Sequence, residues 1–151
     1  MAPNEPVARS APDFLLKDPA GRDHSLKELT GKPVVLHFWA AWCPPCLEEI
    51  PNWVALAQHY QGKPLGFIAV SLDAKWADAL KVLPVDKTPA NVTSLIDLSG
   101  KLSEDYGTYQ FPETYLLNAK HEIVHKWVGG QNWSNPEILK ALDQISGGAA
   151  K

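Results

Sequence analysis

The feature that most constrains this chain is a pair of cysteines, separated by two prolines, placed where a buried strand passes into a helix. Residues 33–39 are almost continuously apolar, which is typical of a central strand covered on both faces. The tetrapeptide from Cys43 to Cys46 follows, with Pro44 and Pro45 between its cysteines, and apolar residues continue after it at helical spacing. Because proline is favoured in the first turn of a helix, Pro44 and Pro45 indicate that this helix begins at or just after Cys43.

Both cysteines of the chain lie in this one motif, so their spacing has to be explained by chemistry. The loop that they close is too short to restrict the unfolded chain much. At a helix start, Cys43 lies at or beside the N-cap, where the positive helix end favours a thiolate and nucleophilic attack. Cys46 lies one turn along, close enough to resolve a mixed disulfide formed on Cys43. The motif predicts a redox-active Cys43–Cys46 disulfide and no further cofactor.

Strand and helix patterns alternate along the rest of the chain and predict a single α/β domain. Strands are expected at 13–16, 33–39, 65–72 and 92–98, with a hairpin over 113–118 and 123–128. Helices are expected at 26–29, 44–60, 76–83, 101–106 and 135–146, and residues 84–91 as a loop. The long helix is expected to bury Leu47, Ile50, Val54 and Ala57. Residues 1–12 are interpreted as a flexible leader, 13–147 as the domain and 148–151 as a tail.

Composition excludes several functional classes. Apolar residues make up 45% and charged residues 21% of the 151 positions, as in an ordinary globular domain. The formal net charge is −3 and the basic residues are scattered, so we expect no binding of nucleic acid. We also expect the protein to be a monomer. Residues 1–12 contain no apolar core segment and are therefore not an intact signal peptide.

Four segments resemble a known family. Val34 to Cys46 resembles the active-site strand and helix of thioredoxins, and Leu47 to Pro51 is similar to the extracytoplasmic TlpA/ResA/CcmG (DsbE) branch. Phe111 to Thr114 resembles the segment that carries the cis-proline, and Ala11 to Phe14 also looks like this branch. The resemblance runs from about Ala11 to Ile145. It implies a thioredoxin-like fold, with a central mixed β-sheet flanked by helices, an N-terminal extension and a central insertion.

The resemblance also implies where and on what the protein acts. Members of this branch work in the bacterial periplasm or outside the cell membrane, and they reduce disulfides of apocytochrome c, its maturation factors or other secreted proteins. The resemblance thus implies a disulfide-containing protein substrate and an upstream membrane thiol donor. It further implies a native chain tethered to the membrane by an N-terminal segment that this sequence does not contain.

Five residues around the motif are expected to contact the substrate. Trp42 precedes the attacking cysteine and is expected to flank it as part of a docking surface, together with Pro44 and Pro45. The bond before Pro112 is expected to be cis and to lie beside the disulfide. That geometry would turn the backbone of Phe111 outward to pair with an extended substrate segment.

Glu49 and His37 each allow two interpretations. Glu49 lies three residues after Cys46 on the same helix. It is either a general base that tunes the thiols, the role of a matching glutamate in the ResA branch, or an exposed carboxylate like Glu48. His37 lies six residues before Cys43, where thioredoxin itself carries a buried acid. It either relays a proton to Cys46 or is a hydrogen-bonded core histidine, which is the interpretation we favour.

Other functions compete with redox exchange. A peroxiredoxin needs Thr or Ser three residues before its reactive cysteine, and Ala40 stands there. A copper chaperone would use Cys43 and Cys46 as soft ligands. Such proteins usually add a nearby His or Met, and the only methionine of this chain is Met1. A non-catalytic adaptor would not need two intact cysteines. The segment His121–His125 matches the zinc-protease pattern, but in a strand its imidazoles would be about 13 Å apart, so no metal site is expected.

The two prolines between the cysteines predict the direction of the reaction. Neither Pro44 nor Pro45 has a backbone N–H to offer the Cys43 sulfur, and no His or Lys lies between the cysteines to stabilise a thiolate. An ionised Glu49 nearby would oppose the thiolate further. We therefore expect a reductant with a potential below about −200 mV, not an oxidant near about −120 mV.

Overall fold

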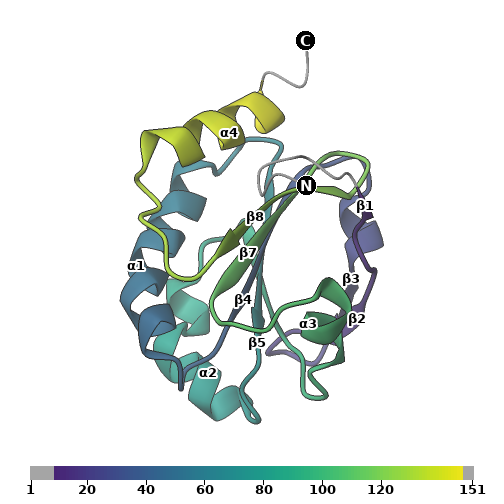
Figure 1. Cartoon of the computed structure of the whole chain (residues 1–151). Coiled ribbons are helices and arrows are strands. Elements are labelled where there is room, and N and C mark those ends of the chain that lie inside the picture. The colour runs from purple at the N-terminus through teal and green to yellow at the C-terminus, as the bar shows by residue number, and fades with distance from the viewer. Residues whose placement is uncertain (1–8, 148–151) are drawn as a thin grey trace.

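The fold is an α/β sandwich built on one mixed sheet, seen here in a computed structural model that describes residues 9–147. Residues 1–8 of the expected leader and the expected tail 148–151 lie outside the described residues. Helices cover both faces of the sheet (Figure 1). The expected thioredoxin-like class, with a mixed sheet between helices, is confirmed.

Eight strands form the sheet in the order β1-β8-β7-β4-β5-β6-β2-β3 within the described range. In chain order they are β1 (Arg9–Ser10), β2 (Leu15–Lys17), β3 (Asp23–Ser25), β4 (Val34–Trp39), β5 (Gly66–Ser71), β6 (Val92–Ile96), β7 (Glu113–Leu117) and β8 (Glu122–Val128). The central strands β4, β5 and β6 are parallel, whereas β7 and β8 add to β4 as an antiparallel hairpin. The predicted central strand and C-terminal hairpin are thus both present.

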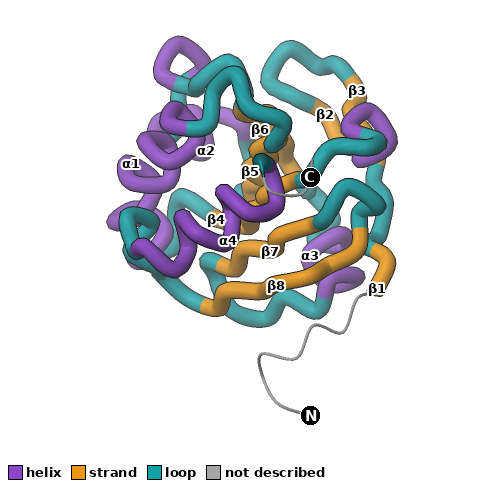
Figure 2. The backbone as a smooth tube through the Cα atoms, turned by 90° about the horizontal axis from the view of Figure 1, so that it is seen from above, coloured by secondary structure: helices purple, strands orange, loops and turns teal. Residues whose placement is uncertain are grey.

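The helical elements are η1 (Leu26–Leu29), α1 (Pro44–His59), α2 (Trp76–Val82), η2 (Val85–Lys87), α3 (Lys101–Tyr106) and α4 (Pro136–Ser146). Figure 2 shows α1, α2 and α4 on one side of the sheet and α3 on the other. No helix within residues 9–147 is long and apolar enough to span a bilayer.

Strand β4 contributes side chains to two cores, one on each face of the sheet. All six of its residues are buried, and alternate residues point to opposite faces. Val35 and Trp39 pack with Cys43 and Cys46 in the core beneath α1. The intervening residues Val34, Leu36 and Phe38 pack in a second core on the side of η1 and α3. The continuous apolar run in the sequence is explained by this two-sided burial.

The inward face of α1 differs from the prediction. Leu47, expected in the core, is 42% exposed. The buried residues of this helix are Cys46, Glu49, Ile50, Trp53, Leu56 and Ala57. Leu47 was placed inward by its helical spacing to Ile50 and Ala57. The prediction was wrong because the buried stripe is rotated toward Cys46 and the much larger Trp53.

Three short elements were not predicted. Arg9 and Ser10, inside the stretch interpreted as a flexible leader, form β1 and pair with the start of β8. Strand β3 follows the turn after β2 as a hairpin, and η2 lies within the stretch 84–91 that was predicted as a loop. Each of these elements has three residues or fewer, too short for a hydrophobic period to be recognised.

Candidate active site

The two cysteines lie at the N-terminus of α1, beyond the carboxyl end of β4. Cys43 is the N-cap residue with an extended backbone, and Pro44 and Pro45 occupy the first turn, as predicted. Cys43 and Cys46 form a disulfide with their Cα atoms 5.3 Å apart. The site thus lies at the carboxyl edge of three parallel strands, where open α/β sheets place their reactive groups.

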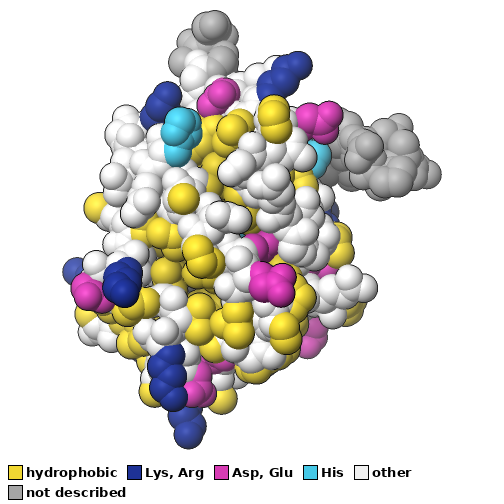
Figure 3. Space-filling view, turned by 90° about the vertical axis from the view of Figure 1, so that its left-hand side faces the viewer, with side chains coloured by type: hydrophobic (Ala, Val, Ile, Leu, Met, Phe, Trp, Pro, Cys, Tyr) yellow, Lys and Arg dark blue, Asp and Glu magenta, His cyan; other side chains and the backbone are white. Residues whose placement is uncertain are grey.

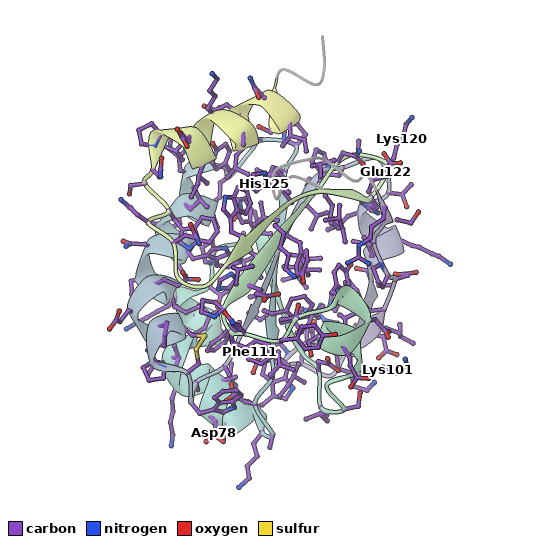
Figure 4. All side chains as sticks on the ribbon, viewed as in Figure 1. Asp78, Lys101, Phe111, Lys120, Glu122 and His125 are labelled. Atoms are coloured by element: carbon purple, nitrogen blue, oxygen red, sulfur yellow. A yellow bond between two sulfur atoms is a disulfide. The ribbon has the colours of Figure 1, made fainter. Side chains whose placement is uncertain are left out.

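The two sulfurs differ in access to solvent. Cys43 retains 5% exposure, whereas Cys46 is fully buried. The Cys43 Sγ lies 3.3 Å from the carbonyl oxygen of Phe111, and the peptide bond from Phe111 to Pro112 is cis. Figure 4 shows Phe111 close to the sulfur–sulfur bond. The prediction of a cis bond beside the disulfide is confirmed, and a thiol on Cys43 could donate to the same carbonyl oxygen.

An apolar surface surrounds the exposed edge of the disulfide. The Trp42 side chain is 62% exposed, and its ring meets that of Phe111 edge to face at 5.9 Å. Pro44 and Pro45 are exposed beside it, whereas Pro112 is buried. Hydrophobic side chains gather on the lower half of the molecular face that carries α1 and α2 (Figure 3). The structure places all five residues around the disulfide, but Pro112, which was expected to contact the substrate, is buried and is not part of the exposed surface.

A groove of about 340 Å³ continues this surface toward α2. Its lining combines apolar and charged side chains, namely Ala41, Trp42, Leu47, Asp73, Asp78, Lys81 and Val82. Figure 4 places Asp78 on the same end of the molecule as the disulfide. An extended polypeptide crossing the disulfide would meet this groove.

Glu49 is buried with 4% exposure, so the interpretation as an exposed carboxylate like Glu48 is wrong. One carboxylate oxygen, Oε2, accepts a hydrogen bond of 2.8 Å from the backbone N–H of Gln131. The other, Oε1, lies 3.1 Å from Nε2 of His37. The helix therefore directs this side chain inward, one turn below Cys46.

His37 is fully buried in the core beneath α1, as the favoured interpretation expected. Its Nδ1 is 2.7 Å from the hydroxyl oxygen of Thr114 on β7. Its ring stacks on Trp53, with the ring centroids 4.8 Å apart, and meets the edge of Trp133. The contact with Glu49 was not foreseen, because no sequence period links residues on a strand and on the following helix.

Asp73 is a structural residue of the site that sequence reasoning missed. It is buried two residues after β5, and both carboxylate oxygens accept from the backbone N–H of Ala41, at 3.1 and 3.0 Å. Its Oδ2 also accepts from the hydroxyl of Ser71 at 2.7 Å. The carboxylate thus ties the segment that leads into Cys43 to the end of the neighbouring strand. An acidic residue directly after a buried parallel strand was the available signal.

The two histidines of the zinc-protease pattern do not share a helix. His121 lies in the turn before β8, and His125 is on that strand, so the zinc-protease pattern is not on a helix. Between residues 9 and 147, no three side chains among His, Cys, Asp and Glu are grouped to hold a metal ion.

Comparison with known proteins assigns the chain to a family. The model of the AhpC/TSA family matches residues 7–126. The chain belongs to the AhpC/TSA family. Among similar proteins, it is 36% identical over 136 residues to the thioredoxin-like protein YneN of Bacillus subtilis, covering 89% of this chain and 78% of the relative. It is 32% identical over 125 residues to the thiol-disulfide oxidoreductase ResA of Bacillus thuringiensis, covering 83% and 71%.

Solved structures agree with this family assignment. A thiol:disulfide interchange protein of the DsbE type from Chlorobium tepidum superposes with a TM-score of 0.75 at 33% identity, over 91% of this chain and 93% of that one. A thiol-disulfide oxidoreductase from Bacteroides vulgatus superposes with a TM-score of 0.77 at 28% identity, over 96% and 99%. The AhpC/TSA chain described here therefore shares the thioredoxin-like fold over nearly its whole length.

Proposed function

We propose that this protein is a thiol–disulfide oxidoreductase that reduces disulfides of proteins outside the cytoplasm. The observation that carries the proposal is the Cys43–Cys46 disulfide at the start of α1, with one sulfur reaching the surface beside the Phe111 carbonyl and the other buried. The names of the relatives, ResA and DsbE, support the same class of reaction.

The reaction proceeds through two exchange steps. In the reduced protein, the Cys43 thiolate attacks one sulfur of a substrate disulfide, and the other substrate sulfur leaves as a thiolate. Cys46 then loses its proton and attacks the Cys43 sulfur, so the internal disulfide forms and the second substrate sulfur leaves. Two electrons have passed from the protein to the substrate. An upstream thiol donor at the membrane restores the reduced form by the same chemistry in reverse.

The burial of Cys46 gives Glu49 its proposed role. A fully buried thiol has no solvent in contact to take its proton, and Glu49 is the buried carboxylate one turn along the same helix. We assign Glu49 as the general base that accepts this proton, as the resemblance to the ResA branch suggested.

Trp42, Pro44, Pro45 and Phe111 form the proposed docking surface, and Pro112 shapes it. The exposed aromatic and proline side chains offer apolar area next to Cys43, and the backbone of Phe111 lies within reach of the same sulfur. An extended substrate segment that pairs with this backbone would be held with its disulfide over Cys43. Such a surface favours an unfolded or loosely folded polypeptide as the substrate.

Cytochrome c maturation, or reduction of other secreted proteins, is the proposed setting. The resemblance to the TlpA/ResA/CcmG branch suggests this setting. A location at the cell surface is supported by a solved exposed lipoprotein thioredoxin from Streptococcus pneumoniae, which superposes with a TM-score of 0.70 at 26% identity. We propose that the working protein is a monomer held at the membrane.

The reduction potential of the Cys43–Cys46 pair tests the direction of the reaction. Equilibration with glutathione or dithiothreitol buffers should give a value below about −200 mV. A value near about −120 mV would identify an oxidant and overturn the reductase assignment.

A peroxidase is the second candidate, because the AhpC/TSA family model matches the chain. Ala40, three residues before Cys43, is fully buried and has no hydroxyl to bind peroxide. We therefore expect peroxide reduction by the reduced protein to be slow compared with disulfide exchange.

A further inference from the structure

The core beneath α1 contains a carboxylate and an imidazole that face each other away from water. His37 is fully buried and Glu49 is 4% exposed, and Nε2 and Oε1 are 3.1 Å apart. The two atoms are not aligned as a hydrogen bond, and neither has another hydrogen-bonding partner in the described part of the chain. Burying such groups is costly unless they are paired, so this arrangement requires a compensating role or interaction.

This pair lies on the side of the sheet that holds the cysteines. Alternation along β4 directs His37 to the same face as Val35 and Trp39, which pack with Cys46. Glu49 follows Cys46 by three residues on α1, a spacing that puts two side chains on one helix face with Cβ atoms about 5–6 Å apart. Val35 and Trp39 have no proton to give up in the reaction, whereas the buried thiol of Cys46 must release one during exchange.

Thr114 allows the pair to exist in two protonation states without an unpaired polar atom on the far side of the ring. With the imidazole neutral and its proton on Nε2 toward Glu49, the Thr114 hydroxyl donates to Nδ1. When the pair gains a proton, Nδ1 carries a hydrogen and donates to the Thr114 oxygen instead. The hydroxyl can perform both roles by rotating, so the added proton needs no movement of the backbone.

We propose that His37 is a positioning residue for Glu49, and that the His37–Glu49 pair holds the proton released by Cys46. This inference rests on the proposed function. As Cys46 attacks, its S–H bond breaks and the proton passes to Glu49, the Cys46–Cys43 bond forms, and the bond from Cys43 to the substrate sulfur breaks with its electrons on the substrate. The pair changes from one net negative charge to none, whichever of its two members carries the added proton. Reduction by the upstream donor returns this proton to the Cys46 sulfur.

The surroundings of the pair leave few other groups to titrate. Trp53 from α1 and Trp133 from the segment before α4 contact the ring, and Thr114 reaches it from β7. The partner of His37 on β5 is Ala69, and Gln131 contributes a backbone N–H to Glu49. Of these groups and the pair itself, only His37, Glu49 and Cys46 have side chains with an ionisable group.

A single-turnover reaction with an aromatic disulfide separates the two steps. Attack by reduced Cys43 releases one coloured thiol, and resolution by Cys46 releases a second. We compare the wild type with His37→Asn, whose amide can donate toward Glu49 but cannot take up a proton. Glu49→Gln and the double variant complete the cycle, and Ser146→Ala, which removes a buried hydroxyl on α4, is the control.

The expected result is a slower second step with an unchanged first step. At neutral pH, His37→Asn and Glu49→Gln each slow resolution about tenfold or more, and the double variant is no slower than the slower single variant. The difference from wild type closes as the pH rises to the range where a cysteine thiol ionises unaided. Thr114→Val should slow the same step, and this variant tests the proposal if His37→Asn does not fold.

Two results would overturn the inference. Resolution that is equally fast with and without the imidazole removes any role for the pair. Resolution that is slowed by the same factor at every pH indicates only a disturbed core. If the first coloured thiol is not released by the wild type, the proposed function itself is wrong, which is a distinct outcome.

Discussion

Replacement of Asp73 by alanine should show how much the active-site segment depends on one buried carboxylate. The carboxylate is 2% exposed and accepts from the Ala41 N–H and the Ser71 hydroxyl. Asp73→Ala leaves both donors without this acceptor. A buried donor left unpaired costs about 1–3 kcal/mol, and removal of the buried charge offsets part of the loss. We therefore expect the free energy of unfolding to fall by about 3 kcal/mol.

Asp97 provides a matched control at the end of the next parallel strand. It is 3% exposed, and its Oδ2 accepts from the backbone N–H groups of Leu102 and Ser103 at 3.0 and 3.3 Å. Asp97→Ala should therefore cost a similar free energy of unfolding. The difference between the two acids is location, because Asp73 holds the segment that leads into Cys43 and Asp97 holds the start of α3.

Two measurements separate stability from reactivity. Urea titrations of the oxidised proteins, followed by tryptophan fluorescence, give the free energies of unfolding. The rate at which reduced Cys43 attacks an aromatic disulfide reports the position of the thiol. Asp73→Ala should lower this rate about threefold to tenfold, since small misplacements of a reacting group are costly. Equal rates in the two alanine variants, or an unfolding free energy within about 0.5 kcal/mol of wild type for Asp73→Ala, would refute the reasoning.

Three further predictions concern the thiols, the docking surface and the pH dependence of stability. Cys46→Ser should trap a stable mixed disulfide with insulin on a non-reducing gel, whereas Cys43→Ser should trap little. The reverse pattern would exchange the roles of the two cysteines. Trp42→Ala should raise KM for insulin about tenfold while leaving kcat, and the reaction with a small aromatic disulfide, unchanged. Burial alone would raise the pKa of Asp18, but the hydrogen bond from His24 and those from backbone N–H groups lower it to about 2. Asp18→Asn should thus reduce the unfolding free energy by about 1 kcal/mol above about pH 4, a loss that vanishes in urea titrations as the pH falls through about 2.

The parts of the fold that the sequence predicts correctly are those with a strong local signal. The apolar run of β4 and the two prolines after Cys43 fix the strand, the helix start and the disulfide between them. The hairpin of β7 and β8 is recognisable because both strands are longer than their turn. These features depend on neighbours in the chain, which the sequence displays directly.

What the sequence does not reveal depends on contacts across the fold. Leu47 and Trp53 lie on different stripes of the same helix, and only the sheet beneath decides which stripe is buried. The sequence leaves open whether Glu49 is exposed like Glu48 or turned toward the thiols, and only the fold places its carboxylate against His37. Asp73 lies far along the chain from Ala41, and the hydrogen bonds between them arise because β4 and β5 are adjacent in the sheet. Such pairings follow from topology and not from local pattern.

The pairing of β1 with β8 places the N-terminal end of the described chain far from the disulfide. Arg9 pairs with Ile123 at one end of β8, whereas Val128, at the other end, pairs with Glu113 directly after Pro112. The span from Ile123 to Val128 corresponds to roughly 17 Å along the strand. A linker joined ahead of Arg9 would therefore hold the domain from the end opposite the disulfide. The attacking sulfur would then point outward from the anchoring surface, free to meet partners that approach from the far side.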